Sequence, residues 1–144
     1  MTDSPGHTVV DRERYARMGL APEMVAPGVH RVPLQLPLDG LRAVNVYVIE
    51  DGDGLALIDG GWAIDVSREL LERSLGEIGY ALGDVRRVLV TDVHRNHYSQ
   101  AIAIRRAVRA EVSLGAGEQP SMRHLLDRRV TTVWTGGASC VSPT

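Results

Sequence analysis

The sequence predicts an α/β fold in which helices pack against a mixed β-sheet. Short apolar runs rich in Val, Ile and Leu alternate with segments whose apolar residues recur every three or four positions. Turn-forming residues separate the two kinds of segment. The resulting order is three strands, followed by helix, strand, helix, strand and helix, which is typical of helices covering a sheet that is at least partly parallel.

The first strands are expected after a polar N-terminal arm, residues 1–27. Residues 29–36 predict a strand bordered by prolines, and residues 44–49 form a second run of mostly branched residues. Asp and Gly residues at 51–54 separate that run from the apolar residues 55–58. Turn-forming residues between two apolar runs predict a β-hairpin.

The rest of the chain is expected to alternate between helices and strands. Apolar residues at helical spacing predict an amphipathic helix over about residues 64–79. The later elements are, in chain order, a strand over 85–90, a helix ending near Ala110, a strand over 111–114 and a third helix beginning near Pro120. Residues 131–144 are rich in Thr, Ser and Gly without a period, so we expect loose structure there.

Several predicted strands are apolar at consecutive positions. The runs 44–49, 55–58 and 88–90 show this pattern, which is typical of strands buried on both faces of a sheet. Three helices and a loose tail are little material to cover two faces. We therefore expect that the arm or another chain covers one face, or that the sequence is part of a larger ancestral domain. A homo-oligomer formed through an exposed sheet face is one consequence.

The composition makes two classes of partner unexpected. The chain has a formal net charge of -2, with 24% charged and 44% hydrophobic residues. Without a net basic field we expect no nucleic-acid partner, and no apolar window is long enough to predict a signal peptide or a membrane span. Cys140 is the single cysteine, so no internal disulfide can form, and we expect a cytoplasmic protein.

One segment carries a candidate metal-binding pattern. Residues 91–98 read Thr-Asp-Val-His-Arg-Asn-His-Tyr and follow directly on the strand predicted at 85–90. Two imidazoles on a short loop at the end of a strand can point into one pocket, and imidazole is a ligand of zinc and similar metals. We interpret His94 and His97 as functional or vestigial metal ligands, the alternative being a polar loop. Tyr98 and Gln100 open the following helix and could face the same pocket, but we expect them on the surface of the helix.

The order of these segments resembles the metallo-β-lactamase-fold hydrolases, and most closely their glyoxalase II-like branch. The resemblance rests on residues 44–49, the turn Asp59-Gly60-Gly61, the helix after it and residues 92–97, and it covers about residues 28–128. It implies a four-layered α-β-β-α sandwich of two similar halves, of which this chain matches the first. The expected organisation is an arm at 1–27, a partial domain at 28–128 and a poorly structured tail at 129–144.

The signature loop of that family is His-x-His-x-Asp-His, and this chain departs from it twice. His94 and His97 match, whereas Asp92 stands at the first histidine and Asn96 at the catalytic aspartate. The resemblance implies one or two zinc ions, one held by Asp92 and His94 and the other by Asn96 and His97, with Asp59 supporting the loop. The amide of Asn96 is neutral and no general base. The family's other ligands lie further along its chain, where this sequence has only His124.

The resemblance implies a metal-dependent hydrolase that cleaves ester, thioester or lactam bonds in a small molecule. Because each metal position keeps a single sure histidine, we expect a truncated copy with weak zinc binding and little or no catalysis. Two alternatives stay open. In the first, a second protomer completes an active zinc hydrolase. In the second, the chain is a non-catalytic oligomeric or binding module.

Overall fold

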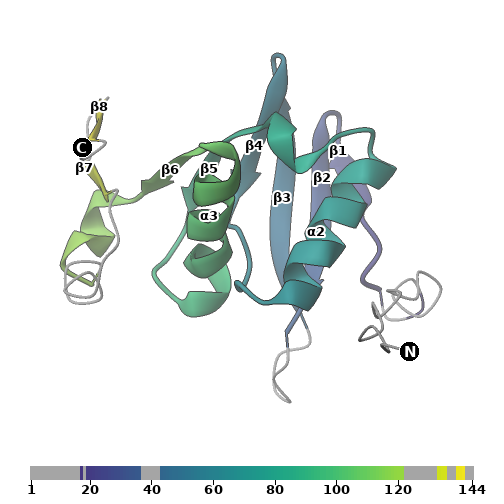
Figure 1. Cartoon of the computed structure of the whole chain (residues 1–144), viewed down its shortest axis with the longest axis horizontal. Helices are drawn as coiled ribbons and strands as arrows, with labels where there is room; N and C mark the ends of the chain where they lie inside the picture. The colour runs from purple at the N-terminus through teal and green to yellow at the C-terminus, as the bar shows by residue number, and fades with distance from the viewer. Residues whose placement is uncertain (1–16, 18, 37–42, 122–132, 136–138, 142–144) are drawn as a thin grey trace, which may run out of the picture.

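The main element of the computed structural model is a six-stranded mixed sheet in the order β1-β2-β3-β4-β5-β6. The structure describes residues 17, 19–36, 43–121, 133–135 and 139–141. The strands of the sheet are β1 (Glu23–Ala26), β2 (Val29–Gln35), β3 (Ala43–Asp51), β4 (Gly54–Ile58), β5 (Val85–Val90) and β6 (Glu111–Leu114). Two helices, α2 (Asp65–Glu77) and α3 (Arg95–Val108), lie in front of the sheet in Figure 1. The predicted α/β class with a mixed sheet is confirmed.

The first four strands form an antiparallel meander. β3 and β4 make the predicted hairpin, in which Asp51 pairs with Gly54 across a two-residue turn. Gly52 opens that turn with a φ of 63°, a left-handed conformation that glycine adopts without a steric penalty. β1 was not predicted from the sequence. It pairs with β2 at the edge of the sheet, where Arg31 forms a 2.8 Å ion pair with Glu23.

The last three strands are parallel, and this determines where the ends of β4 and β5 lie. β4 pairs with β5 and β5 with β6 in parallel register, with α2 and α3 as the respective connections. The carboxyl ends of parallel strands meet at the same edge of a sheet. The residues after Ile58 and after Val90 are therefore neighbours in space although they are far apart in sequence.

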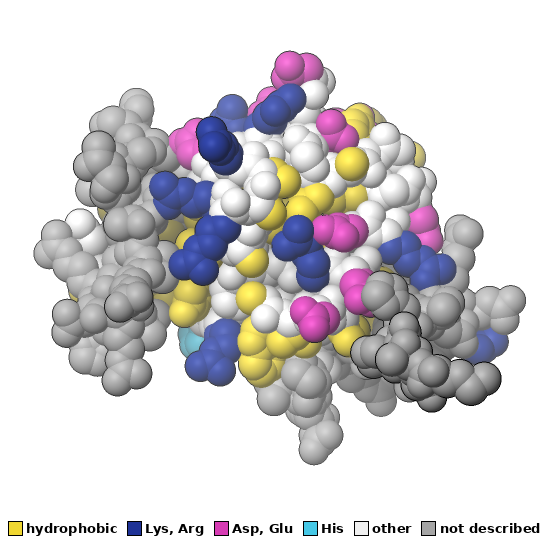
Figure 2. Space-filling model, in the orientation of Figure 1, with side chains coloured by type: hydrophobic (Ala, Val, Ile, Leu, Met, Phe, Trp, Pro, Cys, Tyr) yellow, Lys and Arg dark blue, Asp and Glu magenta, His cyan; other side chains and the backbone are white. Residues whose placement is uncertain are grey.

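The hydrophobic core lies between the two helices and one face of the sheet. Val32, Val46, Val48, Leu57 and Val88 project from this face and are fully buried. The helices contribute their own fully buried apolar side chains, namely Leu71, Leu75, Ala101 and Ile104. Figure 2 shows the opposite, solvent side of the helices, where arginine and acidic side chains are interspersed. Both helices are therefore amphipathic, as their periodicity predicts.

The prediction that the strands are buried on both faces is correct only for β4. In β3 the buried Val44, Val46 and Val48 alternate with more exposed neighbours. In β5 the side chain of Leu89, which points to the face opposite α3, is 40% exposed. The reason is that both described helices cover the same face, so branched residues in β3 and β5 are partly open on the other.

The end of the chain contains two short strands that the sequence did not predict. They are β7 (Val133–Thr135) and β8 (Ser139–Val141), which pair antiparallel. Two 3-10 turns occur earlier, η1 (Leu82–Asp84) before β5 and η2 (Ala116–Glu118) after β6. The predicted third helix begins at Gln119, and its described residues end at Ser121. His124 lies outside the described residues. Among the described helices, none combines the length and the apolar character needed to cross a bilayer.

The close approach of Gly60 to α3 gives a testable prediction. A Cβ atom on Gly60 would lie 2.5 Å from the backbone nitrogen of Ala101 and 2.9 Å from its Cα. Because backbone atoms of a packed helix cannot move aside freely, we expect Gly60→Ala to lower the free energy of unfolding by about 1–3 kcal/mol. Urea denaturation followed by circular dichroism measures this.

Gly76 provides the matched control, since a Cβ atom there meets nothing within 4 Å. Gly76→Ala places alanine inside α2 and is expected to raise the free energy of unfolding by about 0.5–1 kcal/mol. Equal stability of the Gly60→Ala variant and the native chain would contradict the packing described for this turn.

Candidate metal-binding site

The candidate site lies at the shared carboxyl edge of β4 and β5. Asp59 follows β4 directly, and Thr91 and Asp92 follow β5 directly. His94 is the N-cap of α3, and His97 lies in the first turn of that helix rather than in a loop. The parallel pairing of β4 with β5 therefore brings together residues that are more than 30 positions apart.

Asp59 is the most constrained residue of the site. It is 5% exposed and has a φ of 62°, a left-handed conformation that is unfavourable for residues other than glycine. Its Oδ1 accepts hydrogen bonds from the backbone N (2.7 Å) and the Oγ1 (2.9 Å) of Thr91, and that hydroxyl also lies 2.7 Å from Oδ2. These contacts hold a buried carboxylate in one orientation.

The same carboxylate orients His97. Nδ1 of His97 lies 2.9 Å from Oδ2 of Asp59. An ionised carboxylate only accepts hydrogen bonds, so Nδ1 must carry the proton in this contact. The other ring nitrogen of a neutral His97, Nε2, then keeps its lone pair. A histidine held this way by a carboxylate is the usual arrangement in protein metal sites.

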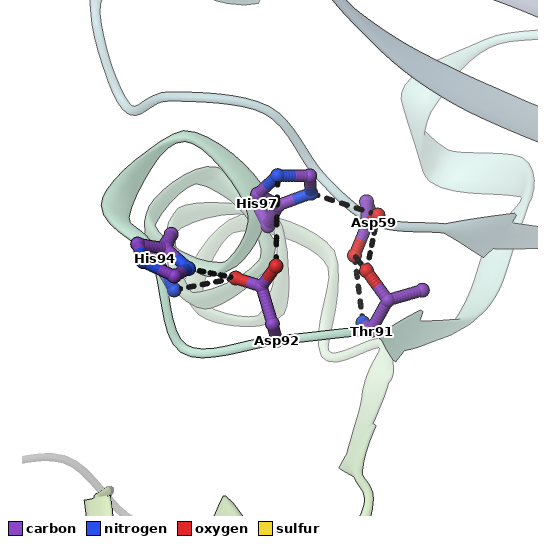
Figure 3. Close-up of polar contacts among 5 residues, drawn as sticks. All are labelled: Asp59, Thr91, Asp92, His94 and His97. Carbon is purple, nitrogen blue, oxygen red and sulfur yellow. Dashed lines mark hydrogen bonds and ion pairs between the residues drawn. The ribbon is translucent and has the colours of Figure 1, made fainter.

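Asp92 stands between the two histidines, as Figure 3 shows. Its Oδ1 accepts a hydrogen bond from the backbone N of His94 at 2.7 Å and lies 2.9 Å from Nδ1 of the same residue. Its Oδ2 faces Nε2 of His97 at 3.8 Å, which is too long for a hydrogen bond. The His94 side chain is 78% exposed, on the side of Asp92 away from His97.

The pKa of Asp92 lies below its ordinary value of 3.8. Partial burial by itself raises this pKa, but the two hydrogen bonds from His94 and the proximity of both imidazoles lower it by more. Asp92 is therefore a carboxylate at neutral pH. Of the two altered positions of the motif, Asp92 is charged and Asn96 is neutral.

Three hydrogen bonds join the turn after Asp59 to α3. The backbone N of Gly60 donates to the carbonyl of His97 (2.8 Å), and the backbone N of Gln100 donates to the carbonyl of Gly61 (3.1 Å). The side-chain Nε2 of Gln100 donates to the carbonyl of Gly60 (2.9 Å). Gln100 is only 1% exposed, so the expectation of a surface position is wrong. The sequence around Gln100 does not indicate that its side chain would meet the carbonyl of Gly60.

The donor atoms do not fit a pair of metal ions. Within the part of the chain that the structure describes, no group of three or more His, Cys, Asp or Glu side chains could hold a metal ion. Asn96 lies half-buried in the first turn of α3 and offers a neutral amide. The structure thus brings Asp59, Asp92 and His97 into one network, with His94 attached to Asp92 at its outer side.

Replacement of Asp59 tests whether its carboxylate holds the site together. In Asp59→Asn one oxygen becomes an NH2 group, which cannot accept hydrogen bonds from Thr91 or His97. We expect the free energy of unfolding to fall by about 1–3 kcal/mol, the usual cost of leaving buried polar groups unpaired. Asp53→Asn, in the exposed hairpin turn, is the control and should stay within about 0.5 kcal/mol of the native chain. Identical losses in both variants would show that Asp59 has no special role.

Comparisons with known proteins agree with the fold. The family model of the metallo-β-lactamase superfamily matches residues 39–134, which is more than half of the chain. No curated protein sequence matches this chain. The match includes the hairpin, the Asp59 turn, both described helices and the altered motif.

Three solved structures share the fold at low sequence identity. They are a Cronobacter sakazakii metallo-β-lactamase with a HARLDQ motif (19% identity, TM-score 0.58, 72% of this chain and 38% of that one), a subclass B3 metallo-β-lactamase from a soil metagenome library (22%, 0.57, 72% and 36%) and a β-lactamase from Chitinophaga pinensis (20%, 0.54, 66% and 32%). The chain thus spans 32–38% of the length of these structures and matches part of their fold. This chain belongs to the metallo-β-lactamase superfamily.

Proposed function

We propose that this chain is a metallo-β-lactamase-fold protein that binds zinc weakly and by itself hydrolyses ester, thioester or lactam bonds little or not at all. Members of the superfamily generally bind zinc, and metal-dependent hydrolysis is the activity expected of the family. The observation that carries the proposal is the donor set. In the described residues no cluster of three metal-binding side chains forms, although the loop, the turn and the helix of the site are all in place.

Two chemical requirements of hydrolysis are poorly met by these residues. A catalytic metal must lower the pKa of a bound water molecule toward about 7, which requires an ion held firmly by several protein ligands. A general base must also accept a proton, and the amide of Asn96 cannot do so. The remaining carboxylate of the loop, Asp92, already accepts two hydrogen bonds from His94.

Relatives with altered loops support the idea that the fold tolerates such changes. The Cronobacter sakazakii structure is described by a HARLDQ motif, which differs from His-x-His-x-Asp-His at two positions. This chain differs at two other positions, those of Asp92 and Asn96. The chain spans only about a third of these structures. A small-molecule substrate and a cytoplasmic location are carried over from the sequence as parts of this proposal.

A second candidate function is a homo-oligomeric or binding module that uses the sheet face opposite the helices. It is favoured by the 40% exposure of Leu89 and by a hollow of about 320 Å³ beside it, lined by Arg87, Glu111 and Ser113 among others. A second copy on this face is also the route by which further metal ligands could complete an active hydrolase. Analytical ultracentrifugation that finds a monomer at all concentrations would count against both ideas.

Restoration of the family motif is the sharpest test of the proposed function. The double variant Asp92→His/Asn96→Asp adds an imidazole and a carboxylate to the two histidines already present. We expect its zinc affinity, measured by isothermal titration calorimetry, to rise at least about tenfold, which corresponds to about 1.4 kcal/mol. Hydrolysis of ester, thioester and β-lactam substrates should be near the uncatalysed rate in the native chain.

The control is Asp53→His, which adds one histidine in the exposed hairpin turn, far from the motif in sequence. Its zinc affinity should match that of the native chain. Rapid hydrolysis by the native chain that is abolished by a chelator and restored by zinc would contradict the proposal.

A further inference from the structure

We propose that the sheet face opposite the helices binds a second copy of this chain, with Arg87 of each copy paired to Glu111 of the other. The inference rests on the second candidate function above and deepens it, because it names the occupant of this face and the residues that select it. It does not depend on zinc binding or on hydrolysis.

The face carries a contiguous apolar row. Tyr47, Ile58 and Leu89 lie side by side on β3, β4 and β5, because the register pairs Tyr47 with Ile58 and Ile58 with Leu89. Their neighbours Leu57 and Val88 point to the core instead and are fully buried. Both described helices cover that core side of the sheet (Figure 1). Leu89 is 40% exposed, and a row of this kind favours contact with another protein surface.

Two opposite charges lie next to the apolar row. Arg87 precedes Leu89 by two residues on β5, so it points to the same face, and the register pairs it with Glu111 on β6. Both side chains belong to exposed residues. Arg87 forms a loose 3.5 Å ion pair with Asp51, whereas no cation of the described residues pairs with Glu111. The patch therefore offers a positive and a negative charge side by side.

This charge pattern is complementary to itself. A two-fold symmetric interface uses the same patch on both copies. An axis that runs along the strands between β5 and β6 places β5 of each copy over β6 of the other, so Arg87 faces Glu111 at two symmetric contacts. Packed sheets lie about 10 Å apart, a distance that an arginine and a glutamate side chain span together. Charge complementarity therefore favours a second copy over a partner of single charge.

The shape of the patch fits the same arrangement. A hollow of about 320 Å³ is lined by residues of β5 and the end of β6, including Ser113 and Leu114. Because Leu89 pairs in register with Ser113, the axis that joins the charges also places Leu89 of each copy over Ser113 of the other. The exposed leucine of one copy thus meets the hollow of its partner, and its removal from water stabilises the pair.

Charge reversal tests the pairing of Arg87 with Glu111. Arg87→Glu leaves two acidic residues in the patch and Glu111→Arg leaves two basic ones, so we expect each variant alone to raise the dimer dissociation constant at least about tenfold. An equimolar mixture of the two should form a heterodimer within about threefold of the native affinity, because opposite charges then meet at both contacts. Sedimentation equilibrium measures mass and affinity, and circular dichroism checks that each variant is folded.

The apolar contact has a matched control. Leu89 on the sheet and Val66 on α2 are both 40% exposed, but they lie on opposite sides of the molecule. Leu89→Glu should raise the dissociation constant at least about tenfold, because it places a charge in the middle of the interface. Val66→Glu should leave it within about threefold of the native value, as expected for a substitution outside the contact.

Several results would overturn the proposal. They are a native chain that sediments as a monomer at every concentration, an assembly larger than a dimer, a mixture that associates no better than its components, or equal effects of Leu89→Glu and Val66→Glu. A dimer that none of these substitutions weakens would leave the second candidate function standing and refute this interface. Zinc affinity and hydrolysis are measured separately. A dimer that hydrolyses rapidly would refute the leading proposed function alone, and an inactive monomer would refute the interface and leave the leading function standing.

Discussion

The candidate site depends on one buried carboxylate. Asp59 ends β4 in a left-handed backbone conformation and binds Thr91 at the end of β5 and His97 at the start of α3. Three segments that the parallel pairing of β4 with β5 brings to one edge of the sheet are thus joined at one residue. The unfavourable backbone conformation is offset by these contacts, a combination that is common where a functional side chain must be aimed in one direction.

The surrounding residues extend this constraint to the whole loop. Gly60 can approach α3 closely because it has no side chain, and this brings its carbonyl within reach of the buried Gln100. The imidazole of His97 is consequently held in place relative to the sheet by Asp59, and the carboxylate of Asp92 is held by the backbone N of His94. The loop is thus held in a defined conformation, although the described residues offer no group of three or more His, Cys, Asp or Glu side chains that could hold an ion.

The sequence predicts the local features of this chain well. The hairpin, β5, β6 and the helical segments follow from turn residues and apolar periods, and the family follows from the motif. The short strands β1 and β7 were missed because they lie in segments without a clear apolar period, residues 1–27 and 131–144. The sequence does not predict that Asp92 and His97 face each other or that Gln100 is buried. Both depend on the distance between α3 and the turn after Asp59, which is set by tertiary packing.

The central claim is that the altered loop cannot hold the two metal ions of the complete motif, because the described residues supply no group of three or more metal-binding side chains. Anomalous X-ray diffraction from crystals grown with zinc tests it most directly. The predicted result is at most one weak, partly occupied anomalous peak at this loop, as weak zinc binding requires. Two fully occupied peaks at the loop, each surrounded by ligands from one and the same chain, would contradict the claim.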